Sequence, residues 1–364
     1  MTRLEIAQHL EIVRNEYYNC FTSAAKLADG SYMIAFRQAA DWQHIFGVNS
    51  HVDPASIAVF VTSQDGIHWD GKPQLLHDDY FYGVMDPALT VLKDGTIFCT
   101  FFIWKVLEKE DVEDHSNVKF YIHDRYIHRY MGVHSIRSTD NGKTWDAPQL
   151  VSKHLALRGK VLEQEDGSLL AAAYGNLSGG GDTSVVTILR SPDRGQTWSE
   201  IGSFREDAGY HLFEPAIYQT EAGKMVCFMR TMKREVAPGE EGIKFPIFMC
   251  ESLDGGVTWS KPRATPLFSP NPPYLLRLRS GNVMMAYGYR LKPYGIRAVI
   301  MNPECSDIDT TTEIVLRDDG GCYDLGYTGL VEVEDGQILV SYYYSHAETG
   351  PWYIGGTLVR EVTS

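Results

Sequence analysis

The chain lacks long apolar runs and has few cysteines, and these two features argue against a membrane-spanning protein and against a zinc site. Its longest apolar stretches, residues 97–104 and 184–189, fall well short of the roughly 20 residues that a membrane-spanning helix needs. The six cysteines are scattered and show no CxxC or Cys/His spacing of a zinc site. We therefore expect no membrane partner, no metal ion or other cofactor, and reduced, mostly buried thiols.

Positive charge is also scarce. The chain has 33 Lys and Arg against 47 Asp and Glu, a net charge of −14. Such a surface repels polyphosphates, so nucleic acid is not an expected partner. The first residues lack the apolar core of a signal peptide. We expect a cytoplasmic protein, or a secreted one if a leader has been cleaved; the oligomeric state is left open.

What the chain does contain is a repeated hairpin signal. Six segments share an apolar run, a turn ending in Gly and a second apolar run, a pattern typical of β-hairpins. Successive turns lie 55 to 72 residues apart, which is enough for four strands each. We predict an all-β chain of six four-stranded antiparallel units in a single domain, residues 1–364. The turn glycines are Gly30, Gly95, Gly167, Gly223, Gly281 and Gly336.

A second repeat follows four of the hairpins: SQDGIHW (63–69), STDNGKTW (138–145), SPDRGQTW (191–198) and SLDGGVTW (252–259). Ser and Asp side chains in such a turn accept hydrogen bonds from backbone N–H groups, Gly supplies a positive φ, and Trp packs beneath. We therefore predict a structural role for these aspartates, away from any central pocket.

This second repeat resembles the Asp-box of the sialidase (neuraminidase) superfamily. The resemblance covers essentially the whole chain and implies a six-bladed β-propeller, in agreement with the six hairpins. We expect the N-terminal segment, residues 3–13, to close the ring as the outer strand of the sixth blade, because a closed ring leaves no free strand edge.

The inner strand of each blade lines the central channel, so equivalent positions should surround one funnel. Nine residues before the turn glycines stand Phe21, Asp86, Arg158, Glu214, Pro272 and Tyr327. The second strands return to the same face and carry Arg37 and Arg230, with Arg290 and Arg297 in the fifth unit. Guanidinium groups suit carboxylate recognition, so the pattern predicts a pocket for an acidic ligand.

The resemblance to sialidases also implies roles for three of these residues. Members of that family carry a Glu at the start of the fourth inner strand, an Arg at the end of the next strand, and a Tyr nucleophile that opens the last blade. Glu214, Arg230 and Tyr327, within GYTGL (326–330), are similar. Tyr327 would then be the nucleophile and Glu214 its base, since a phenol with a pKa near 10 needs activation at pH 7.

One family position differs. Sialidases open blade one with Phe-Arg-Ile-Pro, whose Arg belongs to the triad that binds the sugar carboxylate, whereas this chain has CFTSA (20–24). Arg37 or Arg158 could supply the missing cation, and an acidic sugar other than sialic acid is an alternative. The general acid is left open among Asp41, Asp53 and Asp86.

The loop 38–56 also holds Trp42 and His51, which we expect at the rim of the site as sugar contacts. His211 is a further candidate contact. The insertion 105–130 holds His115, His123 and His128, but their spacing matches no compact metal site. We expect a solvated lid or an oligomer contact there.

The expected activity is that of an exo-acting, retaining glycoside hydrolase. It would release a terminal sialic acid or related acidic sugar from an oligosaccharide or glycoconjugate. One alternative is a lyase or uronidase acting on glucuronate-type oligosaccharides, in which a Tyr, His51 or His211 moves the proton α to the carboxylate. A second is a non-catalytic carbohydrate-binding propeller, which the charged residues of the inner strands disfavour.

Overall fold

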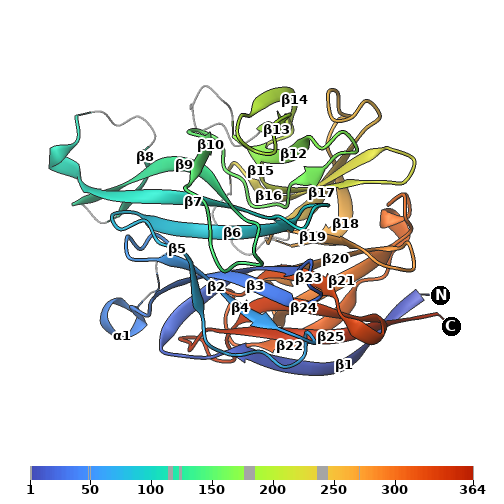
Figure 1. Cartoon of the computed structure of the whole chain (residues 1–364), viewed down its shortest axis with the longest axis horizontal. Coiled ribbons are helices and arrows are strands. Elements are labelled where there is room, and N and C mark those ends of the chain that lie inside the picture. Colours follow the sequence, from blue (N-terminus) through green and yellow to red (C-terminus); the bar gives the residue numbers. More distant parts are fainter. Residues whose placement is uncertain are drawn as a thin grey trace.

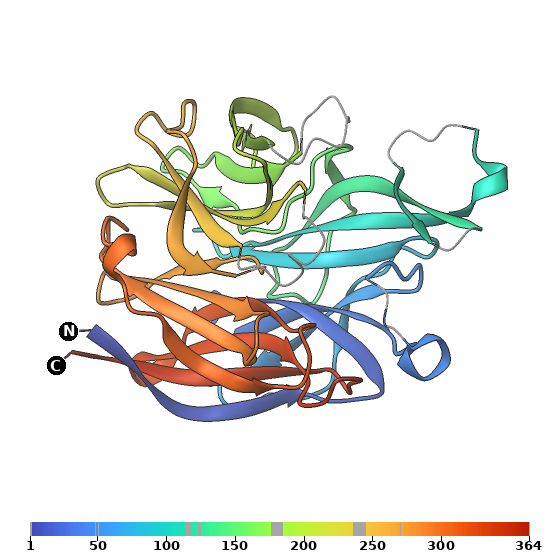
Figure 2. The same ribbon diagram turned by 180° about the vertical axis from the view of Figure 1, so that it is seen from behind.

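The computed structural model describes residues 2–47, 49, 51–113, 118–122, 125–175, 185–235, 245–269 and 271–363. These residues form six antiparallel sheets of a six-bladed β-propeller, as predicted from the hairpins (Figures 1 and 2). Within the described ranges, no helix has the length and apolar character needed to span a membrane.

The blades follow one another along the chain. Blade one contains β2 (Tyr17–Lys26), β3 (Tyr32–Ala40), β4 (Ile57–Ser63) and β5 (Gln74–His77). Blade two contains β6 (Gly83–Val91), β7 (Ile97–Glu108), β9 (Tyr126–Ser138) and β10 (Gln149–Ser152), with β8 (Val118–Ile122) beside β9. Blade three contains β11 (Leu162–Glu163), β12 (Leu169–Tyr174), β13 (Val185–Ser191) and β14 (Ser199–Arg205).

Blade four contains β15 (Tyr210–Gln219), β16 (Met225–Lys233), β17 (Pro246–Ser252) and β18 (Arg263–Phe268). Blade five contains β19 (Tyr274–Arg277), β20 (Val283–Tyr289), β21 (Tyr294–Met301) and β22 (Ile314–Gly320). Blade six contains β23 (Gly326–Glu332), β24 (Gln337–Tyr344), β25 (Tyr353–Thr363) and β1 (Thr2–Val13). Short helical turns are α1 (Gln43–Phe46), η1 (Lys109–Asp111), η2 (Ile308–Thr310) and η3 (Glu334–Gly336).

The ring closes on the N-terminal strand. β1 pairs antiparallel with β25 from Thr2 opposite Thr363 to Val13 opposite Ile354, so the two chain ends lie side by side (Figures 1 and 2). This pairing joins the ends of the chain within one sheet, and the outer strand of blade six therefore comes from the start of the sequence.

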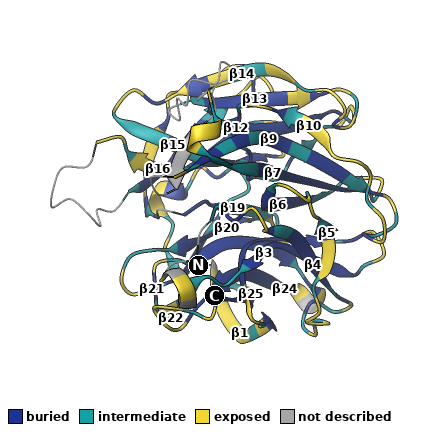
Figure 3. Ribbon diagram, turned by 90° about the vertical axis from the view of Figure 1, so that its left-hand side faces the viewer, coloured by how far each residue is buried: buried dark blue, intermediate teal, exposed yellow. Residues whose placement is uncertain are grey.

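The core lies between the blades. The second strands, such as β3, β12 and β24, are buried on both faces because each blade packs against two neighbours. Outer strands such as β14 consist mainly of exposed and half-buried residues (Figure 3). All six cysteines are buried free thiols.

The Ser-Asp-Gly-Trp turns join the outer strands. In the third of them, Ser191 Oγ accepts a hydrogen bond from Gly195 N at 2.7 Å, and Asp193 Oδ1 accepts one from Thr197 N at 2.8 Å. Trp198 Nε1 donates to the Gly195 carbonyl at 3.2 Å. The side chains thus close the turn, far along each blade from its inner strand.

The insertion in blade two, for which we expect a solvated lid or an oligomer contact, contains regular β-structure in its described residues. Its described residues extend the sheet, since β7 runs on to Glu108, β9 begins at Tyr126 and β8 pairs with β9. His128 lies within β9, whereas His115 and His123 lie outside the described residues. Alternating apolar residues in this segment form strands because the neighbouring strands offer them a long edge to pair with.

Candidate active site

Four inner strands share an unusual backbone conformation at equivalent positions. Phe21, Asp86, Glu214 and Tyr327 have φ values of 62°, 49°, 48° and 47°. Each lies at a β-bulge, where the pairing register of the strand shifts. Positive φ costs a residue with a side chain about 1–3 kcal/mol, and such strain is typical of functional sites. A bulge also changes the direction of a side chain, and these four side chains line one cavity.

The cavity has a volume of about 440 Å³ and two chemically distinct parts. Asp86, Glu214, Arg230 and the phenol of Tyr327 form a polar part. Aromatic side chains from blades two, three and four line the rest: Phe102, Trp104, His128, Tyr130, Tyr174 and Phe213. A few convergent polar groups within a largely apolar hollow are typical of a small-molecule site.

Tyr327 and Glu214 are in direct contact. The Tyr327 hydroxyl donates a hydrogen bond to Glu214 Oε1, and Arg230 Nη1 lies 3.0 Å from Glu214 Oε2 and 3.4 Å from Tyr327 Oη. Burial and the Glu214 carboxylate raise the pKa of Tyr327 well above its usual value, although Arg230 opposes this. The phenol therefore carries its proton at neutral pH, with a carboxylate placed to accept that proton.

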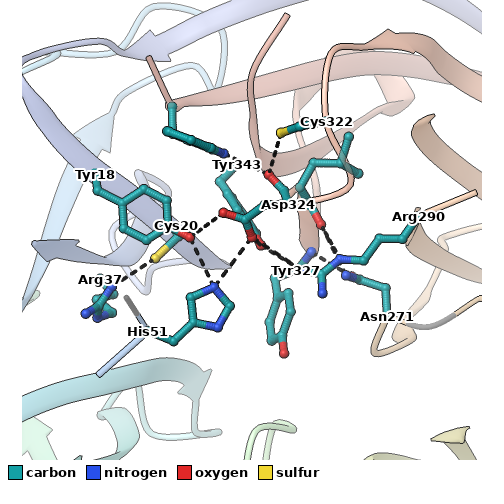
Figure 4. Close-up of polar contacts among 12 residues, drawn as sticks. Tyr18, Cys20, Arg37, His51, Asn271, Arg290, Cys322, Asp324, Tyr327 and Tyr343 are labelled. Atoms are coloured by element: carbon teal, nitrogen blue, oxygen red, sulfur yellow. Dashed lines mark hydrogen bonds and ion pairs between the residues drawn. The ribbon is translucent and has the colours of Figure 1, made fainter. Parts of the chain in front are cut away.

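Two further arginines flank the ring of Tyr327. The guanidinium of Arg158 lies 5.2 Å from the ring centroid and that of Arg290 lies 5.6 Å from it. Arg158 Nη2 donates to the Thr22 carbonyl at 2.7 Å, and Arg290 Nη2 donates to the Tyr343 hydroxyl at 2.7 Å (Figure 4). Both cations lower the cost of negative charge on the phenol oxygen.

Asp86 has the environment of a proton donor. Its side chain is buried, and its Oδ1 has no hydrogen-bond partner among the described residues. Burial raises the pKa of Asp86 to about 7, against the opposing effect of Arg158. A carboxylic acid that is still protonated near neutral pH is suited to general acid catalysis.

Asp41 and Asp53, the other two candidate acids, shape the loop that carries them. Asp53 accepts hydrogen bonds from Trp42 Nε1 and Ala55 N, both at 2.8 Å. Asp41 Oδ1 accepts from Gln43 N at 3.0 Å and from Asn49 Nδ2 at 2.9 Å. The same hydrogen bond holds Trp42 within the loop. Of the three candidate acids, Asp86 is the one that lines the cavity together with Tyr327.

His51 and Asp324 form a second polar cluster beside the cavity (Figure 4). Asp324 accepts hydrogen bonds from the hydroxyls of Tyr18 at 2.6 Å and Tyr343 at 2.7 Å, and lies 3.5 Å from His51 Nε2. Burial raises the pKa of Asp324, but His51 and Arg290 outweigh it and hold that pKa below its usual range.

His51 lines the cavity and packs against Phe21 at 4.9 Å between ring centroids. Sequence reasoning missed Asp324 because it precedes the inner strand instead of lying within it. Its place two residues before the GYTGL segment was the available signal. The cluster connects the loop of blade one to the residues that carry Tyr327.

The remaining predicted contacts lie in different surroundings. Arg37 is fully buried, with Nη1 3.6 Å from Cys20 Sγ. Arg297 belongs to β21, where its guanidinium lies 3.6 Å from Glu313 and 4.5 Å from the ring of Tyr289. The His211 ring lies 5.6 Å from that of Phe213 at the start of β15. The structure thus brings Arg158, Arg230 and Arg290 together around Tyr327, and places Arg297 in the outer half of blade five.

Comparison with known proteins agrees with this architecture. Residues 119–340 match the model of the BNR repeat-like domain. The chain belongs to this family of sialidase-like propellers. A solved structure of a protein of unknown function from Dyadobacter fermentans is 32% identical, with a TM-score of 0.86, and the match covers 98% of this chain and 99% of that one. No match was found among curated proteins.

More distant structures share the fold alone. A Hadza microbial sialidase, Hz136, is 16% identical with a TM-score of 0.65. The match covers 95% of the present chain and 66% of the sialidase. The GH93 α-L-arabinofuranosidase of Fusarium graminearum, solved with arabinobiose, is 11% identical with a TM-score of 0.67, and the match covers 98% of both chains. The structural neighbours of this chain therefore include glycosidases of more than one kind, a sialidase and an arabinofuranosidase.

Proposed function

We propose that this protein is a retaining exo-glycosidase in which Tyr327 is the nucleophile. The observation that carries the proposal is the contact of the Tyr327 hydroxyl with the Glu214 carboxylate, which Arg230 also binds, in the wall of the cavity. A phenol with a carboxylate base matches the tyrosine nucleophile that distinguishes sialidases from two-carboxylate glycosidases.

The reaction has two steps. Tyr327 Oη attacks the anomeric carbon as its proton passes to Glu214, and Asp86 donates a proton to the departing glycosidic oxygen. A covalent glycosyl–tyrosine intermediate results. Asp86, now ionised, then takes a proton from water, whose oxygen attacks the anomeric carbon, while Tyr327 leaves and recovers its proton from Glu214. Two displacements on one carbon retain its configuration.

The charge around Tyr327 supports an acidic sugar as the substrate. Arg158, Arg230 and Arg290 gather at this residue in a chain whose net charge is −14. Their positive charge attracts a carboxylate and stabilises the developing phenolate. A terminal sialic acid or a related acidic sugar on an oligosaccharide is the substrate that follows.

A neutral sugar is the second candidate. Of the arginines predicted to hold a carboxylate, Arg230 is the one that lines the cavity, and its Nη1 is already bonded to Glu214. The similarity in fold to an arabinofuranosidase agrees with a neutral furanoside.

A panel of substrates tests both candidates. The protein would be incubated with 3′-sialyllactose, arabinobiose and uronate-capped oligosaccharides, and the released sugar would be identified together with its first-formed anomer. Retention of configuration and release of one terminal sugar are expected. Absorbance from a 4,5-unsaturated product would instead identify a lyase.

The variant Tyr327→Phe tests the nucleophile. We expect it to fold normally and to lose at least about 10³-fold in kcat, because the attacking oxygen is gone. Tyr80→Phe is the matched control, since Tyr80 is 85% exposed and its loss should leave turnover unchanged. Undiminished turnover by Tyr327→Phe would rule out the proposed chemistry.

A further inference from the structure

Blade two carries an extension that the other blades lack among the described residues. The second strand, β7, is 12 residues long, whereas the second strands of the other blades have 6 to 9. The third strand, β9, is 13 residues long, whereas the third strands of the other blades have 7 to 11. The extended strands project from the body of the propeller (Figure 1, cyan to green). Where they border the cavity they present Phe102, Trp104, His128 and Tyr130, which we call the aromatic wall.

The aromatic wall is already assembled. The Trp104 ring centroid lies 3.6 Å from that of His128 and 4.8 Å from that of Tyr130, and the Tyr130 hydroxyl donates to the Leu155 carbonyl at 2.6 Å. Burial lowers the pKa of His128 to about 3, so this ring is neutral. Trp104 remains partly exposed whereas His128 and Tyr130 are buried. Of these three rings, Trp104 is therefore the one that a ligand can cover.

The position of the wall relative to Asp86 indicates which part of a substrate it meets. Asp86 lies on β6, and β7 is the neighbouring strand in the same blade. The general acid must reach the oxygen of the departing sugar. That sugar therefore lies on the side of blade two, where the wall stands.

We propose that the aromatic wall is a subsite for the leaving-group sugar, whose ring stacks on Trp104. The C–H groups on one face of a sugar ring are apolar and weakly positive, so they pack well on the negative face of an indole. The inference rests on the proposed function, because Asp86 defines which side the leaving group occupies. It implies that a disaccharide or longer glycan is a better ligand than the terminal monosaccharide.

Binding tests the subsite without turnover. In the Tyr327→Phe background, calorimetry would compare arabinobiose with arabinose, and 3′-sialyllactose with N-acetylneuraminic acid. We expect the oligosaccharide of one pair to bind about 10- to 100-fold more tightly than its monosaccharide, an advantage that Trp104→Ala abolishes and Trp104→Phe partly keeps. Tyr80→Ala, on an 85% exposed aromatic residue, should change nothing. The proposal is overturned if neither oligosaccharide is preferred over its monosaccharide, or if Trp104→Ala leaves the preference intact.

Kinetics separates this proposal from the proposed function. On whichever oligosaccharide is hydrolysed, Trp104→Ala should lower kcat/KM about 10- to 100-fold, while hydrolysis of the corresponding glycosyl fluoride, which has no leaving-group sugar, stays the same. Equal losses on both substrates would refute the subsite and leave the glycosidase proposal standing. If the wild type hydrolyses neither oligosaccharide, yet Trp104→Ala abolishes the preference for one of them, the glycosidase proposal fails and the subsite stands.

Discussion

Replacing Asp86 with Asn should make the protein more stable at alkaline pH and less active. Burial raises the pKa of Asp86 from its ordinary value of 3.8 to about 7. A carboxyl group that binds its proton more tightly in the folded state destabilises the fold as pH rises from about 4 to about 7. At 1.36 kcal/mol for each pH unit, the ionised side chain costs about 4 kcal/mol in total, of which about 2.5 kcal/mol falls between pH 5 and pH 8.

Thermal unfolding measures this effect. An unfolding entropy of about 2.1 cal/mol/K per residue over 364 residues converts 2.5 kcal/mol into a shift of about 3 °C. The Tm of the wild type should therefore fall by about 3 °C more than that of Asp86→Asn between pH 5 and pH 8. Every other titrating group is present in both proteins, so the difference between the two curves isolates Asp86.

The same variant tests the role of Asp86 in the reaction. Wild-type kcat/KM should decline above about pH 7 as the acid ionises. Asp86→Asn should lose about 10²- to 10⁴-fold on an oligosaccharide, and far less on a nitrophenyl glycoside, whose leaving group needs no proton. Parallel Tm curves for the two proteins, together with an equal loss on both substrates, would refute the assignment.

Two further predictions concern stability. Asp324→Asn should cost about 2 kcal/mol, or a Tm about 3 °C lower, because the carboxylate accepts two tyrosine hydroxyls. Since its pKa is depressed in the fold, this contribution is complete above about pH 4 and is lost as pH falls further, so wild type and variant should converge in acid. Gly195→Ala should destabilise the protein by about 1–3 kcal/mol more than Gly30→Ala. Both glycines have φ of 89°, but a Cβ at Gly195 would meet Phe98 at 2.4 Å, whereas one at Gly30 meets nothing within 4 Å; equal Tm losses would show that this contact relaxes without cost.

Turn chemistry explains why so much of the fold could be predicted. A hairpin depends on a positive φ at one residue and on apolar residues either side, and both are local properties of the chain. Six such signals, with four Ser-Asp-Gly-Trp turns, therefore indicated the number of blades and which residues occupy equivalent inner-strand positions. Because Glu214 and Tyr327 stand at the same distance from their turn glycines, the sequence predicts that both side chains point into one central cavity although they are far apart along the chain.

What the sequence determined by itself is thus the six-bladed propeller and the ring of candidate residues at its centre. Only the tertiary structure decided how those residues face one another. Bulges point the side chains of Asp86 and Tyr327 toward the same cavity. The Asp53 carboxylate instead accepts a hydrogen bond from Trp42 of its own loop. Trp104 gains its surroundings from another strand of its own blade, and Asp324 from a strand of the neighbouring blade one, and these strands meet only after folding. A local sequence pattern is enough to predict turns and strands. The burial of a side chain and its hydrogen-bond partners depend on every neighbour in three dimensions, and burial and partners together set the pKa values and the shape of the site.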